Sequence, residues 1–194
     1  MRECMKKNLV GLSIVAMTTL ALSSSVLAEG TNLDVNFTAN IRETTCDMKL
    51  VGGTGSDTQQ TLTFGSNGQV RLEDVRARNV SATFKIAMVE CPSSLKSLKT
   101  TISGKKGSYS SSGLVNQLIA SGGANFSAVE IARESAPAAP FDVNSTADAK
   151  RLVWTPEEID NKEVQLIATM FETQPGELTI GAFQTVATFE FTYE

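Results

Sequence analysis

The side chains that most enzymes use for acid–base chemistry and metal binding are sparse in this chain of 194 residues, which contains no histidine. Histidine is the commonest general base, the usual activator of a serine or cysteine nucleophile and the commonest ligand of transition metals. Any catalysis would therefore depend on carboxylates, lysines or tyrosines. The composition argues against an enzyme, and we predict no catalytic residue, no metal site and no cofactor.

Carboxylates cluster at one place, where Glu157, Glu158 and Asp160 follow Thr155-Pro156. Two opposed carboxyl groups can divide acid and base roles between them, as in glycoside hydrolysis. The same residues in a polar stretch are also typical of a solvated turn or of the first turn of a helix. We favour the turn or helix start. A hydrolase that uses carboxylates is the least favoured of three functions, and the other two are given below.

The first 28 residues have the features of a secretory signal peptide. Arg2, Lys6 and Lys7 precede an uncharged run over residues 9–22, and the small-residue site Val26-Leu27-Ala28 follows. The run has 14 residues, whereas a membrane-spanning helix needs roughly 20. We therefore predict a signal peptide over residues 1–28, cleavage after Ala28 and no membrane span in the mature chain.

Cleavage would leave 166 residues, enough for one domain with its own core. The mature chain would carry 14 basic and 20 acidic side chains, a net charge of −6. This balance argues against nucleic-acid binding, which needs clustered cations. Cys46 and Cys91 remain as an even pair in an exported chain, so we predict a disulfide between them, with two independent buried thiols as the alternative.

Alternating apolar and polar side chains, the pattern of half-buried strands, dominate the mature chain. Residues 33–41 alternate without a break. Clusters of Gly, Ser and Pro separate the apolar segments, and this rhythm is typical of an antiparallel sandwich. Residues 114–120 fit either a short helix or a strand. The other predicted strands cover residues 61–64, 82–89, 98–103, 128–133, 151–154, 164–171 and 183–193.

The first and last of these strands have unusual positions. The alternating segment 33–41 lies ahead of Cys46, where a lone terminus would usually be frayed. The last strand reaches the end of the sequence, so we expect its outer edge to be unpaired. An exposed apolar edge invites pairing with another chain.

Four segments in this order resemble the chaperone–usher pilins, the type 1-like fimbrial subunits. The segment ending at Cys46 looks like the family's first strand, and the segment ending at Cys91 looks like the strand that carries its second cysteine. A short strand between them and a C-terminal strand with tyrosine next to last complete the resemblance. The matching segments are Phe37-Thr38-Ala39-Asn40-Ile41-Arg42-Glu43-Thr44-Thr45-Cys46, Leu62-Thr63-Phe64-Gly65, Phe84-Lys85-Ile86-Ala87-Met88-Val89-Glu90-Cys91 and Ala187-Thr188-Phe189-Glu190-Phe191-Thr192-Tyr193-Glu194.

The resemblance implies an all-β, immunoglobulin-like sandwich that lacks its last strand and is completed by a donor strand from another chain. Residues 42–194 would form the sandwich, and residues 29–41 would be the N-terminal donor-strand extension running into the first strand. The implied partners are neighbouring pilin subunits, a periplasmic chaperone and an outer-membrane usher, and the implied location is a cell-surface fimbria that contributes to cell adhesion. The expected donor side chains are Leu33, Val35, Phe37, Ala39 and Ile41, and the expected acceptor groove and chaperone contact is formed by Phe189, Phe191 and Tyr193.

Two other interpretations of the same segments stay open at this point. Residues 33–41 also fit an ordinary first strand that pairs within its own domain. A second function from another class is a secreted sandwich that binds a glycan or host surface directly, which exposed Tyr109 and Trp154 would favour. We assign Trp154 and Phe183 to the core.

Overall fold

The computed structural model describes residues 46–193 of the chain. The predicted signal peptide, the predicted extension and all five expected donor side chains, Leu33, Val35, Phe37, Ala39 and Ile41, lie outside the described residues.

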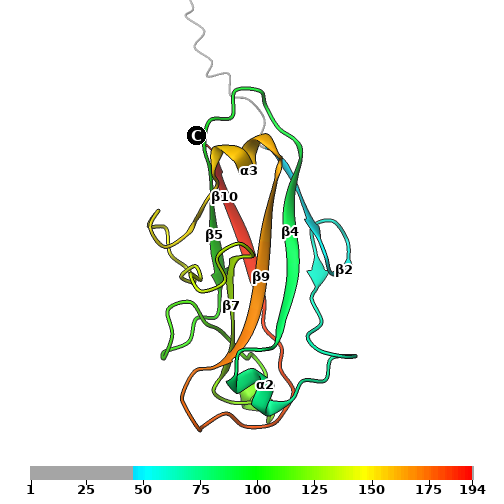
Figure 1. Cartoon of the computed structure of the whole chain (residues 1–194), viewed down its shortest axis with the longest axis vertical. Coiled ribbons are helices and arrows are strands. Elements are labelled where there is room, and N and C mark those ends of the chain that lie inside the picture. The colour runs from blue at the N-terminus through cyan, green and yellow to red at the C-terminus, as the bar shows by residue number, and fades with distance from the viewer. Residues whose placement is uncertain (1–45, 194) are drawn as a thin grey trace, which may run out of the picture. The chain divides into compact units, whose positions relative to one another are not determined.

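The larger of the two main sheets has five antiparallel strands in the order β1-β4-β9-β7-β6. The long strands β4 (Ser81–Glu90) and β9 (Glu163–Glu172) form its centre, as Figure 1 shows. Strand β1 (Asp47–Val51) is one edge, and β7 (Ser127–Arg133) leads to the short β6 (Leu114–Val115) at the other.

The second sheet has three strands in the order β10-β5-β8, so β5 (Leu98–Gly104) is its centre. The edge strands are β10 (Ala187–Tyr193) and the two-residue β8 (Leu152–Val153). The short strands β2 (Thr54–Gly55) and β3 (Gln60–Thr61) pair with each other after β1. The helical turns are α2 (Leu72–Arg76), η1 (Ile119–Ser121) and α3 (Pro156–Asp160).

The core lies between the two sheets, because alternate side chains of each strand point inward. In β4 the inward residues Phe84, Ile86 and Met88 are all buried. Trp154 is also buried, as predicted, and its Nε1 donates a hydrogen bond of 2.9 Å to Thr100 Oγ1. Strand β9 contributes Val164, Leu166, Ala168 and Met170, and β5 contributes Leu98 and Ile102.

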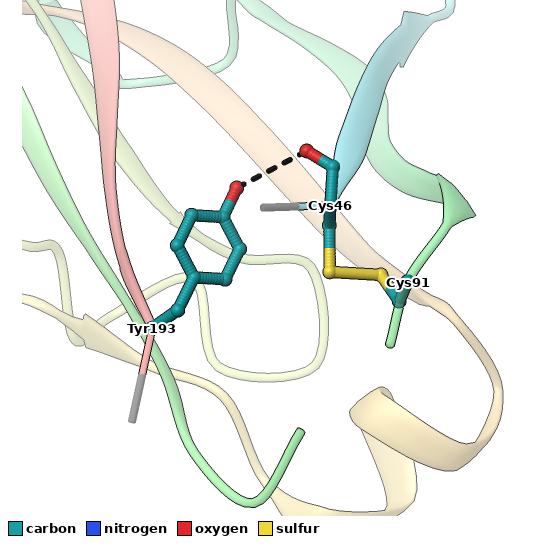
Figure 2. The surroundings of a disulfide bond; sticks show 3 residues. All are labelled: Cys46, Cys91 and Tyr193. Carbon is teal, nitrogen blue, oxygen red and sulfur yellow. Dashed lines mark hydrogen bonds between the residues drawn. A yellow bond between two sulfur atoms is a disulfide. The ribbon is translucent and has the colours of Figure 1, made fainter. Parts of the chain in front are cut away.

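The predicted disulfide is present and joins the residue before β1 to the residue after β4. Cys46 and Cys91 are bonded with their Cα atoms 4.3 Å apart. Figure 2 shows the ring of Tyr193 directed at this corner, where its Oη donates a hydrogen bond of 3.3 Å to the Cys46 carbonyl oxygen. The end of β10 is thereby attached to the beginning of β1.

Several predicted strand boundaries need correction. The last strand begins at Ala187 instead of residue 183, because β5 ends at Gly104, the partner of Ala187, and offers no register partner to residues 183–186. The predicted strand 61–64 is reduced to its first residue, within β3. Residues 114–120 contain both of the structures considered, the strand β6 followed by the start of η1.

Candidate functional site

Strand β10 has a partner on one side only. It pairs with β5 along its whole length, from Ala187 opposite Gly104 to Tyr193 opposite Leu98. Within residues 46–193 no strand lies on its other side, so β10 is an edge of the three-stranded sheet. Such an edge presents backbone N–H and C=O groups that can pair with an added strand.

Among the described residues, the inward face of β10 is only partly covered. Ala187, Phe189, Phe191 and Tyr193 are half-buried, and the residues between them are exposed. Phe189 packs against the buried Phe84 of β4, with ring centroids 5.9 Å apart. This contact places the β10 face toward the core of the sandwich, although part of that face stays accessible.

An apolar groove lies beside this face. Its larger part has a volume of about 940 Å³ and has Phe183 and Phe189 on one wall. The opposite wall is built by residues around the β2–β3 hairpin, including Leu62 and Phe64. The core residues Val129, Ile131 and Met170 also line it. The groove therefore reaches down to the packed interior of the larger sheet.

A second part of the groove follows β10 toward its C-terminal end. It has a volume of about 690 Å³ and is lined by Phe191 together with Met48 and Ile86. Leu50 and Phe189 line both parts, so the two are continuous along β10. The combined groove separates β10 from β1, the facing edges of the two sheets.

Two of the three predicted groove residues line it. Phe189 and Phe191 do so, whereas Tyr193 lies beyond its lining, at the disulfide. Burial and the nearby carboxylate of Asp47 raise the pKa of Tyr193, so its hydroxyl stays protonated and available as a donor to Cys46. Phe183, predicted to be core, is half-buried and belongs to the groove wall instead.

The opposite wall was not predicted from the sequence. Leu50 in β1 and Leu62 and Phe64 after β3 face β10 across the groove. Their apolar character was visible, but nothing local indicates that the hairpin folds toward β10. That packing is a long-range property of the sandwich.

The carboxylate cluster is structural, as favoured from the sequence. Thr155 caps α3, accepting a hydrogen bond of 3.2 Å from the Glu158 backbone N–H, while the Glu158 side chain accepts one from the Thr155 N–H. Burial opposes ionisation of Glu158, but hydrogen bonds from Arg133 and Thr155 outweigh it and lower its pKa. The Arg133 guanidinium lies 2.7 Å from Glu158 Oε1. An ionised, capped glutamate of this kind serves helix formation and not proton transfer.

The aromatic residues that would favour a direct glycan site do not meet. Trp154 is buried, whereas Tyr109 is 61% exposed and packs beside Phe126 with ring centroids 6.0 Å apart. No helix within the described part of the chain is long and apolar enough to cross a bilayer.

Comparison with known proteins adds the family. The model of the family described as "Fimbrial protein" matches residues 35–194. This chain belongs to the fimbrial protein family. It is therefore a pilin subunit, a structural protein and not an enzyme, as the missing histidine and the resemblance predicted.

One curated protein and two solved structures illustrate what this fimbrial protein is similar to. The uncharacterized fimbrial-like protein YadM of Escherichia coli (strain K12) is 27% identical over 190 residues, covering 93% of this chain and 96% of YadM. The crystal structure of the P pilus rod subunit PapA is similar with a TM-score of 0.50 at 18% identity, covering 83% of this chain and all of PapA. The P pilus adaptor subunit PapF has a TM-score of 0.47 at 16% identity, over 80% of this chain. The likeness to PapA supports the predicted immunoglobulin-like all-β fold.

Proposed function

We propose that this fimbrial protein polymerises by donor-strand complementation, in which the groove beside β10 receives a strand from a neighbouring subunit. The observation that carries the proposal is the combination of an unpaired β10 edge with an apolar groove that runs along the same strand. An added strand would pair with the edge and cover the half-buried side chains in one step. That mode of binding gives affinity through main-chain hydrogen bonds and specificity through alternate side chains.

The donor strand that we propose is the segment of this chain with Leu33, Val35, Phe37, Ala39 and Ile41 on one face. Its nine residues would span about 30 Å when extended. The half-buried alternate residues from Phe183 to Phe191, which line the groove, mark a run of nine residues on the acceptor side. A nine-residue strand therefore fits within the groove, with its five apolar side chains facing inward.

Magnitudes indicate that such a complex is stable only when the fit is complete. Burying four large apolar side chains contributes on the order of 1.5 to 3 kcal/mol each, and the backbone hydrogen bonds roughly 0.5 to 1.5 kcal/mol each. Ordering a flexible segment costs about 1 to 2 kcal/mol per residue. A slip of one residue would turn all five apolar side chains outward, so the register decides the binding.

An empty groove also bears on the two other expected partners, the periplasmic chaperone and the outer-membrane usher. An open apolar edge in the periplasm would aggregate, which favours a periplasmic chaperone that contacts Phe189 and Phe191 before assembly. Export past that stage would use an outer-membrane usher, and the assembled fimbria would contribute to adhesion at the cell surface. These expectations rest on the family resemblance together with the geometry of the groove.

A peptide copied from residues 29–45 tests the acceptor half of the proposal. Added to the purified full chain at about 100 times its dissociation constant, it should stabilise the fold by roughly 2.7 kcal/mol and raise Tm by roughly 5 to 10 °C. The control peptide has serine in place of Val35 and Phe37 and should leave Tm unchanged. Equal effects of both peptides, or none of either, would contradict the proposal.

Deleting residues 29–41 tests the donor half. The shortened chain should still bind the peptide, because its groove is intact, but it should not add as a donor to another subunit. Polymerisation at the wild-type level would rule out residues 33–41 as the donor strand.

A further inference from the structure

Large apolar side chains are exposed mainly at one end of the sandwich. Within residues 46–193, four of the six such residues are Val70, Ile119, Ile180 and Val186, with exposed fractions of 37%, 37%, 84% and 52%. We call these four residues the apolar collar. Single exposed apolar residues are ordinary, but a group of them marks an interaction surface.

The collar is continuous with the groove. Val70 and Val186 line the larger part of the groove, and so does Gly181, the residue next to Ile180. Figure 1 shows the link between β9 and β10, which carries Ile180, at the end of the sandwich where α2 lies. This is the end at which β10 begins, opposite the end where Tyr193 meets Cys46.

Hydrogen bonds and close packing join the two segments that carry Ile119 and Ile180. The Ala182 carbonyl oxygen, next in the chain after Gly181, accepts bonds from Ala124 N–H at 3.0 Å and from Asn116 Nδ2 at 2.8 Å. A Cβ atom on Gly181 would lie 2.5 Å from the Ala124 nitrogen, so only glycine permits this approach. The segment after η1 and the link before β10 are therefore tied together, and the collar is a formed surface.

The length of the connector limits where a donor's own sandwich can lie. Four residues separate Ile41 from Cys46, and five extended steps span at most about 17 Å. A donor strand that leaves the groove at the collar end would therefore bring the Cys46 end of its own sandwich against the collar. That end carries Val89 in β4, which is 55% exposed and adjacent to the Asp47–Glu90 pair.

We propose that the apolar collar of one copy docks on the Cys46 end of the sandwich of a second copy, with Val89 as its contact. This inference rests on the proposed donor-strand function and adds a contact between folded domains to it. The two surfaces differ and lie at opposite ends of each copy, so the contact is heterologous and repeats into an open fibre. It would set the relative orientation of neighbouring subunits, which a flexible connector alone would not.

The test separates strand binding from domain docking. The double variant Ile119→Ser/Ile180→Ser should bind the peptide of residues 29–45 as the wild type does, because the peptide brings no second sandwich. Assemblies of the full-length double variant should dissociate at least about tenfold faster, as expected for the lost burial of an isoleucine side chain. Val89→Ser should have a similar effect, and the conservative Ile180→Leu should dissociate at the wild-type rate.

Each other outcome overturns a defined part of the account. Unchanged dissociation of both serine variants would overturn the docking proposal while leaving the groove as the strand site. Peptide binding by a wild-type chain that never assembles with itself would overturn the second copy as occupant. Absence of peptide binding by the wild-type chain would instead contradict the proposed function, and this inference with it.

Discussion

Strands β9 and β10 both direct apolar side chains inward, but their surroundings are very different. Both have apolar residues at every inward position, but the inward residues Val164, Leu166, Ala168 and Met170 of β9 are buried, whereas those of β10 are half-buried. Strand β9 has a neighbour on each side, and β10 has only β5 within the described residues. The difference shows that the β10 face has the composition of a core face and that residues 46–193 cover only part of it.

The largest effect on peptide binding is expected from a charge placed in the groove. Phe189→Asp would place an unpaired carboxylate under the donor strand, which should weaken binding of the peptide of residues 29–45 by at least about 1000-fold. Isothermal titration calorimetry measures the affinity. The matched control Glu190→Ser changes an outward residue of the same strand and should bind within about twofold of the wild type.

Truncation of one residue in each strand makes the comparison quantitative. Leu166→Ala in β9 should lower the free energy of unfolding by about 2 to 5 kcal/mol whether or not peptide is bound. Phe189→Ala should cost about 1 to 2 kcal/mol in the free chain and about 3 to 5 kcal/mol with peptide, because the peptide completes its burial. Denaturant titrations give both values. Equal costs for Phe189→Ala in the two states would show that its face is already covered.

The disulfide next to β1, one wall of the groove, should stabilise the fold by reducing the conformational entropy of the unfolded chain. Its sequence separation is 45 residues, and the chain-entropy model gives roughly 4 kcal/mol for a loop of that length. The variant Cys46→Ser/Cys91→Ser should lose about this amount of unfolding free energy. A free-thiol assay that finds two reactive thiols in the native wild-type protein would contradict this assignment.

The smallest effect is expected at the far end of β10. Tyr193→Phe removes the hydrogen bond to the Cys46 carbonyl oxygen and should cost about 0.5 to 1.5 kcal/mol of unfolding free energy. Peptide affinity should change little, because Tyr193 lies beyond the groove lining. A loss of peptide binding as large as that of Phe189→Asp would mean that the groove extends to this residue.

The strands with sustained alternation were predicted closely from the sequence. The predicted segment 82–89 became β4 (Ser81–Glu90), and 164–171 became β9 (Glu163–Glu172). Strand β1, which was not predicted separately, is a five-residue edge without a long pattern, and α2 is a single turn, too short for helical periodicity to show.

Only the β10 wall of the groove was expected from the sequence. Alternation reports which face of a strand is buried, and it places Phe189 and Phe191 on the inward face of β10, where they line the groove. Alternation does not report backbone pairing. The last strand was therefore predicted to begin at residue 183, although the first residue that pairs with β5 is Ala187. Leu62 and Phe64 form the opposite wall through packing between distant segments, which no local pattern encodes.

Amide hydrogen exchange of β10 is the most direct measurement of the central claim, which is that this strand lacks a neighbour until another chain supplies one. In the free full-length chain, the alternate β10 amides that point away from β5 should exchange much faster than the amides of β9. Addition of the peptide of residues 29–45 should slow them to rates like those of β9. The account would be contradicted if, without peptide, the β10 amides that point away from β5 exchanged as slowly as the amides of β9.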